Sequence, residues 1–137
     1  ESVMSAYRNM GIRAYVQPFF EDVERLISEA QIIVCRAGSN TLADISVVGR
    51  PAILVPLKHA KDNHQLHNAK HFVSGGAGII IKQDEFTPAR LSEELKRIFS
   101  HPNNVLSRFS ERAHSQARPR AAESLATACF QLAETHS

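Results

Sequence analysis

The sequence has no tryptophan and only two cysteines, Cys35 and Cys129, which lie far apart. A small secreted domain held together by disulfides needs a denser cysteine framework, so we interpret both as reduced thiols of a cytosolic protein. No apolar run approaches the roughly 18 residues that a membrane-spanning helix needs, and we predict no transmembrane helix. A polybasic run and an RNP-like aromatic cluster are also missing, and the net charge is only +2, which disfavours a nucleic-acid partner.

The sequence also lacks the short motifs that mark many catalytic centres. We find no GxSxG elbow, no P-loop and no convincing nucleophile–base pair, so the catalytic residues stay unassigned. The histidines at positions 59, 64, 67 and 71 raise the question of a metal, because His67 and His71 are spaced i, i+4. No HExxH glutamate or nearby cysteine accompanies them, so we predict neither a metal nor a cofactor.

What the chain does have is an alternation of strand-like and helix-like segments. Its 137 residues, 43% of them apolar, suit about one domain with a packed core. The alternation favours an α/β fold, with a parallel Rossmann-like sheet and flanking helices. We expect strands at 12–16, 31–35, 52–56 and 78–82, the last three buried and the strand at 31–35 covered on both faces. We expect helices at 19–30, 40–48, 62–74, 87–99, 104–117 and 119–135.

Two helix ends carry strong local signals. Thr87 is placed to cap a helix that begins with Pro88, and Gly49 is placed to end one. The chain opens inside what looks like the tail of a further helix, closed by Gly11, and four strands are few for such a sheet. We therefore interpret residues 1–137 as a single, partial domain whose first strands precede this sequence.

The turn after the first buried strand, RAGSNTLAD, is the first candidate site. Ligands of open α/β sheets bind beyond the carboxyl ends of the strands. Gly38 permits a tight turn, and the N–H groups of Ser39, Asn40 and Thr41 then lie at a helix start, where a diphosphate is favoured. Asp44, one turn further on, could accept hydrogen bonds from ribose hydroxyls. The alternative is that Ser39 or Asn40 only caps the helix and that Asp44 only favours its dipole.

The second candidate site lies in LKHAKDNHQLHNAKHF, after the strand at 52–56. His64, Gln65 and Asn68 fall on the first turns of a predicted helix, and Gln65 and Asn68 share one face. Amide side chains suit sugar hydroxyls because each offers donors and an acceptor. The alternative is a solvated helix capped by Asp62 or Asn63.

A third segment, VQPFFEDV, contains two adjacent phenylalanines. We expect at least one of Phe19 and Phe20 to pack in the core. If Phe20 faces the cleft instead, its backbone and ring could border a nucleobase.

Taken in order, these segments resemble the donor-binding half of GT-B glycosyltransferases, in particular the MurG-type UDP-N-acetylglucosamine transferases that make lipid II. The resemblance is carried by CRAGSNTLADISVVGRPAILVPL, DNHQLHNA and GAGIIIKQDEF, and it extends over essentially the whole chain. Each segment alone is weak evidence for the family, whereas the three segments in this order are specific to it. The resemblance implies that this is the C-terminal donor domain and that the N-terminal acceptor domain lies outside these residues.

The resemblance also implies a role for each candidate residue. Phe20 would meet the uracil through its backbone, and Asp44, where the family often has Glu, would bind the ribose. Arg36 occupies a basic position before the turn, and its role stays open. The diphosphate and sugar would lie near Gly38, Ser39, Asn40 and Thr41, and the N-acetylglucosamine would be recognised by His64, Gln65 and Asn68.

The implied reaction is an inverting transfer that needs no metal. A hydroxyl of lipid I (undecaprenyl-diphospho-MurNAc-pentapeptide) attacks the anomeric carbon of UDP-N-acetylglucosamine, and UDP leaves. The whole enzyme would be peripheral at the cytoplasmic face of the bacterial inner membrane, and these residues alone would be inactive. Three alternatives remain: the donor-binding subunit of a split GT-B transferase, a UDP-N-acetylglucosamine epimerase of related fold, and an α/β domain without a ligand.

Overall fold

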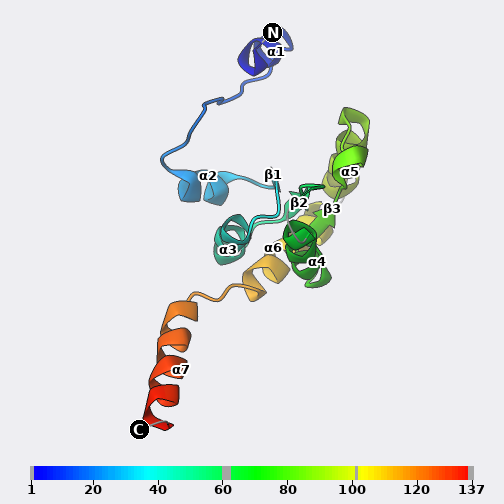
Figure 1. The fold of residues 1–137 in the computed structure, drawn as a ribbon. Coiled ribbons are helices and arrows are strands. Elements are labelled where there is room, and N and C mark those ends of the chain that lie inside the picture. The colour runs from blue at the N-terminus through cyan, green and yellow to red at the C-terminus, as the bar shows by residue number, and fades with distance from the viewer. Residues whose placement is uncertain (1, 60–62, 101, 136–137) are drawn as a thin grey trace.

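A computed structural model describes residues 2–59, 63–100 and 102–135 of the chain. Three short parallel strands form one sheet in the order β1–β2–β3 (Figure 1). The strands are β1 (Ile33–Cys35), β2 (Ala52–Leu54) and β3 (Gly78–Ile80). The helices are α1 (Val3–Asn9), α2 (Val23–Glu29), α3 (Ser39–Val48), α4 (His64–Ser74), α5 (Pro88–Ser100), α6 (Pro102–Ser115) and α7 (Ala121–Thr135), with a 3-10 turn η2 (Gln83–Glu85). The predicted α/β class is confirmed.

The central strand β2 joins two apolar cores because its side chains alternate between the faces of the sheet. Ala52 and Leu54 pack with residues of α2, α3 and α4, and with Ala113 of α6. Ile53 points to the opposite face, where it packs with Ile81 and with apolar side chains of α5 and α6. All three residues of β2 have no exposed surface, as predicted for a strand covered on both faces.

β1 differs from this prediction. Val34 is the register partner of Ile53 and therefore lies on the same face of the sheet. Its side chain is nevertheless 42% exposed. Val34 does not belong to the core that Ile53 forms with α5 and α6, so our expectation of two covered faces was wrong here.

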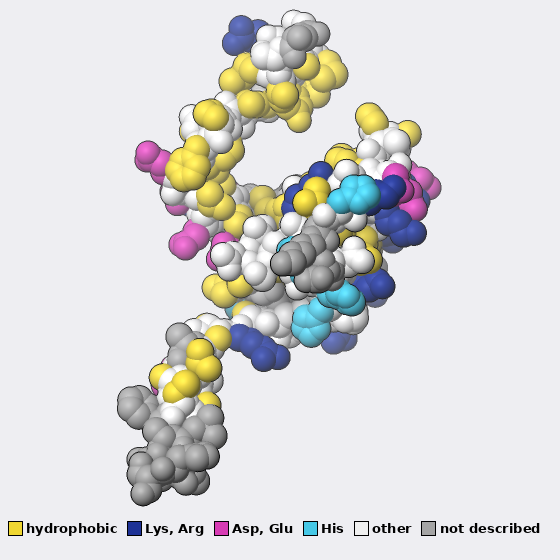
Figure 2. Space-filling model, viewed as in Figure 1, with side chains coloured by type: hydrophobic (Ala, Val, Ile, Leu, Met, Phe, Trp, Pro, Cys, Tyr) yellow, Lys and Arg dark blue, Asp and Glu magenta, His cyan; other side chains and the backbone are white. Residues whose placement is uncertain are grey.

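The predicted strand at 12–16 is also wrong for the described residues. These residues run without regular structure between α1 and α2, and α1 lies away from the sheet at the top of Figure 1. A strand needs a neighbour to complete its hydrogen bonds, and none of the described strands pairs with this segment. Ile12 and Tyr15 of this segment are exposed, and Figure 2 shows hydrophobic surface near the N-terminal end of the molecule.

The helix ends follow the local signals closely. The Arg90 N–H donates to Thr87 Oγ1 over 3.1 Å, and α5 begins at Pro88 as predicted. Gly49 ends α3 in the left-handed conformation with φ 73°, which favours glycine. α4 begins one residue after Asn63, and the predicted start at Asp62 lies outside the described residues. No helix in the described part of the chain combines the length and the apolar character that crossing a membrane requires.

Candidate functional site

The turn between β1 and α3 leaves the first N–H groups of α3 available. Gly38 is the N-cap residue, and the first bond of the helix runs from the Leu42 N–H to the Gly38 oxygen over 3.0 Å. No side chain caps this helix among the described residues, so the alternative that Ser39 or Asn40 serves as the cap is excluded. The N-terminus of α3 is therefore a set of unpaired donors with a partial positive charge, which suits an anion.

Gly38 itself is not required by the backbone conformation. Its φ of −69° and ψ of 141° are extended values that any residue adopts, so our tight-turn reason for this glycine was wrong. A methyl group at this position would meet only the Oγ1 of Thr41, at 3.8 Å. What the glycine provides is open space directly beside the helix N-terminus.

Two amide side chains of α4 reach the loops beside this turn, and each is fixed in orientation. The Leu57 N–H donates to Gln65 Oε1 over 3.0 Å, and Asn68 Nδ2 donates to the Ala37 oxygen over 3.1 Å. A backbone N–H can only donate and a carbonyl can only accept, so neither amide can be flipped without losing its bond. Gln65 is therefore left with its NH₂ group for a ligand, and Asn68 is left with its oxygen and its second N–H.

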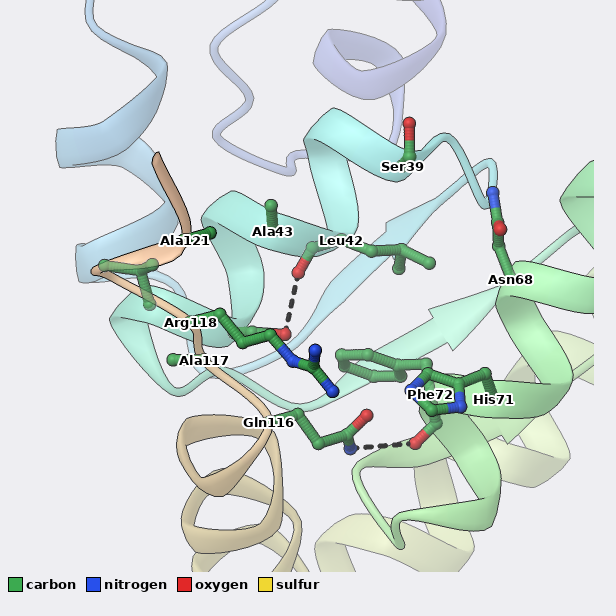
Figure 3. Close-up of a pocket in the computed structure, with 12 residues that line it drawn as sticks. Ser39, Leu42, Ala43, Asn68, His71, Phe72, Gln116, Ala117, Arg118 and Ala121 are labelled. Atoms are coloured by element: carbon green, nitrogen blue, oxygen red, sulfur yellow. Dashed lines mark hydrogen bonds between the residues drawn. The ribbon is translucent and has the colours of Figure 1, made fainter. Parts of the chain in front are cut away.

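A groove of about 360 Å³ connects the two helices (Figure 3). Ser39 of α3 and Asn68 of α4 both line it, so the structure brings together residues from the first two candidate segments. The floor is largely apolar, with Leu42 and Phe72. The side chain of Arg118, from the connection between α6 and α7, lies across it in Figure 3.

The remaining predicted residues do not line the groove between α3 and α4. Asp44 is on α3 and its side chain is exposed, as is His64 at the start of α4. Phe20 lines a separate hollow of about 400 Å³ formed by residues of the segment 15–26, and its ring contacts Tyr15 at a centroid distance of 5.3 Å. Neither Phe20 nor the 75% exposed Phe19 belongs to the two cores, so the expectation that one of them packs there was wrong.

Sequence reasoning missed a set of polar contacts at the same edge of the sheet. Arg36 Nη1 donates to the Val55 oxygen over 3.1 Å and to Gln83 Oε1 over 2.9 Å. Lys58 and Asp84 form an exposed ion pair of 3.0 Å, and the hydrogen bond from Lys58 lowers the pKa of Asp84. Gln83 directly follows the third strand-like run, and the rule that ligands bind beyond carboxyl strand ends would have directed attention to it.

The histidines and Cys35 in the described part of this region raise the questions of metal binding and thiolate chemistry. A search of the described residues finds no group of three or more His, Cys, Asp or Glu side chains arranged to hold a metal. Cys35 is free, and burial raises the pKa of its thiol to about 11, so it is neutral near pH 7. Figure 2 shows Lys, Arg and His side chains over the part of the surface that α4, β3 and α5 occupy, with acidic side chains beside some of them.

A parallel sheet with helices on both faces, and polar groups gathered beyond the carboxyl ends of its strands, is the architecture of nucleotide-binding α/β domains. Comparison with known proteins narrows this class. The model of the glycosyltransferase family 28 C-terminal domain matches residues 1–125, and the chain belongs to this family.

Two curated relatives share one functional name. The UDP-N-acetylglucosamine--N-acetylmuramyl-(pentapeptide) pyrophosphoryl-undecaprenol N-acetylglucosamine transferase of Alkalilimnicola ehrlichii is 41% identical over 133 residues, which are 97% of this chain and 37% of the relative. The protein of the same name from Agrobacterium fabrum is 38% identical over 137 residues, all of this chain and 36% of that relative.

A solved structure supports the same assignment. The crystal structure of Acinetobacter baumannii MurG matches with a TM-score of 0.75 and 33% identity, over 89% of this chain and 37% of that one. The predicted resemblance to MurG-type transferases is thereby confirmed. The chain spans little more than a third of the length of these relatives.

Proposed function

We propose that these residues form the UDP-sugar donor domain of an enzyme that transfers N-acetylglucosamine from UDP-N-acetylglucosamine to lipid I, which yields lipid II for peptidoglycan synthesis. The observation that carries this proposal is the uncapped N-terminus of α3 beside two oriented amides of α4. The first feature suits a diphosphate and the second suits a sugar. The names of the two relatives identify the donor and the acceptor.

Each part of the donor then has a partner of matching chemistry. Asp44, on the exposed side of α3, accepts hydrogen bonds from the ribose hydroxyls. The uracil lies at Phe20, whose hollow is separate from the groove between α3 and α4 in this structure. The diphosphate takes the N–H groups near Gly38, Ser39, Asn40 and Thr41, and the N-acetylglucosamine takes His64, Gln65 and Asn68.

The reaction requires little more from this domain than electrostatic stabilisation. When the lipid I hydroxyl attacks the anomeric carbon, negative charge develops on the departing UDP, and the positive end of α3 stabilises it without a metal. The acceptor site belongs to a domain outside these residues. In the relatives, this domain corresponds to the region that the chain does not match. We place the complete enzyme peripherally at the cytoplasmic face of the inner membrane, where its lipid acceptor is available.

The 137-residue chain alone should make no lipid II, because we propose that the acceptor binds to another domain of the enzyme. The complete gene product that carries this sequence should make it from lipid I and UDP-N-acetylglucosamine. Thin-layer separation of radiolabelled products checks both expectations. Lipid II formed by the isolated chain would contradict the assignment of the donor and acceptor sites to different domains. Epimerised or hydrolysed UDP-N-acetylglucosamine without lipid II would favour the epimerase alternative.

Gly38→Ala should fold normally and yet bind UDP about tenfold more weakly, because the methyl group fills the space through which the diphosphate approaches the helix N-terminus. Isothermal titration calorimetry with UDP, paired with a thermal melt, measures both effects. If Gly38→Ala binds UDP as tightly as wild type, the diphosphate does not bind at this turn.

A further inference from the structure

We propose that Arg36 is a positioning residue, which ties the turn before α3 to the loop before α4 and so sets the spacing between the diphosphate and sugar contacts. This inference rests on the proposed function. Arg36 follows β1 directly, and its Nη1 donates across the sheet edge to the oxygen of Val55, just after β2, over 3.1 Å. The same nitrogen donates to Gln83 Oε1, just after β3, over 2.9 Å. One side chain therefore links the segments that follow all three strands.

Gln83 extends this link to the loop before α4. Its Oε1 also lies 3.4 Å from the backbone nitrogen of Lys58, as an acceptor for that N–H. Both neighbours of this oxygen can only donate, so the amide orientation is fixed by chemistry. Gln83 thus acts as a shared acceptor between the Arg36 guanidinium and the loop.

The two parts of the proposed donor site are connected through these bonds. Arg36 lies in the turn that leads into α3, and Asn68 of α4 holds the same turn through the Ala37 oxygen. The loop before α4 is held by Gln83 on one side and by Gln65, through the Leu57 N–H, on the other. Since α3 offers the diphosphate donors and α4 offers the sugar contacts, these side chains fix the distance that one ligand must span.

Arg36 uses a single nitrogen for both of its bonds, and this detail separates positioning from direct phosphate binding. One ammonium group of a lysine can donate to the same two acceptors. A bidentate guanidinium–phosphate contact, in contrast, cannot be reproduced by lysine. Arg36→Lys is therefore expected to retain a positioning function and to lose a phosphate-binding one.

The test is a double-mutant cycle in the complete gene product. We expect Arg36→Met and Gln83→Leu each to weaken UDP-N-acetylglucosamine binding about fivefold, and the double variant to be about as weak as either single one. Calorimetry with uridine should show no change, because uridine spans neither contact. Arg36→Lys should stay within about twofold of wild type. A positioning role thus predicts that UDP-N-acetylglucosamine affinity falls relative to the affinities for UDP and for uridine, neither of which spans both contacts. Loss of stability alone does not produce this difference.

The matched control is Asp84→Asn, which removes an exposed ion pair between the same two loops and should change affinity by less than about twofold. If Gln83→Leu binds like wild type while Arg36→Met is weak, Arg36 contacts the diphosphate directly and the proposal fails. If all three ligands weaken equally as the unfolding temperature falls, Arg36 is only a scaffold residue and the proposal also fails. A wild-type protein that binds none of the ligands would instead contradict the proposed function, and with it this role.

Discussion

Gly78→Ala should destabilise the protein by about 3 kcal/mol and lower its unfolding temperature by about 10 °C. Gly78 is the register partner of Ala52 in the central strand, and a Cβ at this position would overlap the Ala52 carbonyl oxygen. This oxygen belongs to the backbone and cannot rotate away as a side chain does. β3 would have to move from β2, which would weaken the bond between the Ala52 N–H and the Ala77 oxygen.

Thermal unfolding followed by circular dichroism measures this effect, and Gly38→Ala supplies the matched control. Both variants add one methyl group to a glycine near the sheet. The methyl group at Gly38 would have only an ordinary van der Waals contact, with Thr41 Oγ1. The control should melt at or slightly above the wild-type temperature, since alanine restricts the unfolded chain. A Gly78→Ala protein that melts with the control would mean that β2 and β3 are not paired in this register.

The parts of the fold that were predicted correctly depend on local chemistry. Thr87 with Pro88 and Gly49 act on their own helix ends, and the structure has α5 and α3 bounded as these residues indicate. The core strand at 52–54 is continuously apolar, a pattern that does not depend on where its neighbours lie.

The parts that were not predicted depend on partners elsewhere in the chain. Residues 12–16 have strand-like composition, but composition cannot supply a neighbouring strand, and none of the described strands pairs with them. Val34 belongs to a run as apolar as β2, yet it lies outside the core that Ile53 forms with α5 and α6 and is exposed. Burial of a strand is a property of the packed layers, and the run of residues shows only that burial is possible.

In the candidate site, too, local features could be predicted from the sequence and long-range contacts could not. The sequence predicts that Gln65 and Asn68 share a helix face, because that follows from helical spacing. It does not show which end of each amide is free, because the deciding bonds come from Leu57 and Ala37 in other segments. The contact between Arg36 and Gln83 joins residues 47 apart, a distance over which no local pattern operates.

Gln65→Glu should reduce UDP-N-acetylglucosamine affinity about 30-fold, or ~2 kcal/mol, while the fold is kept. The new carboxylate can still accept the Leu57 N–H, which now donates to Oε1 over 3.0 Å. The free end of the side chain changes from an NH₂ donor to an anionic acceptor, which cannot donate to a sugar oxygen and repels the diphosphate. UDP, which lacks the sugar, should lose only about threefold through this repulsion. Calorimetry with both ligands gives the difference.

The comparison with Gln65→Met decides whether Gln65 recognises the sugar or only holds the loop. Methionine removes both the bond to Leu57 and the NH₂ donors, whereas glutamate keeps the bond and replaces the donors with a negative charge. If the loop contact alone mattered, Gln65→Glu would bind UDP-N-acetylglucosamine nearly as well as wild type, and only Gln65→Met would be weak. If the free NH₂ group meets the sugar, both variants are weak toward the sugar nucleotide. If Gln65→Glu lowers the affinities for UDP and UDP-N-acetylglucosamine by the same factor, the effect is due to charge repulsion alone. Gln65 then does not contact the sugar.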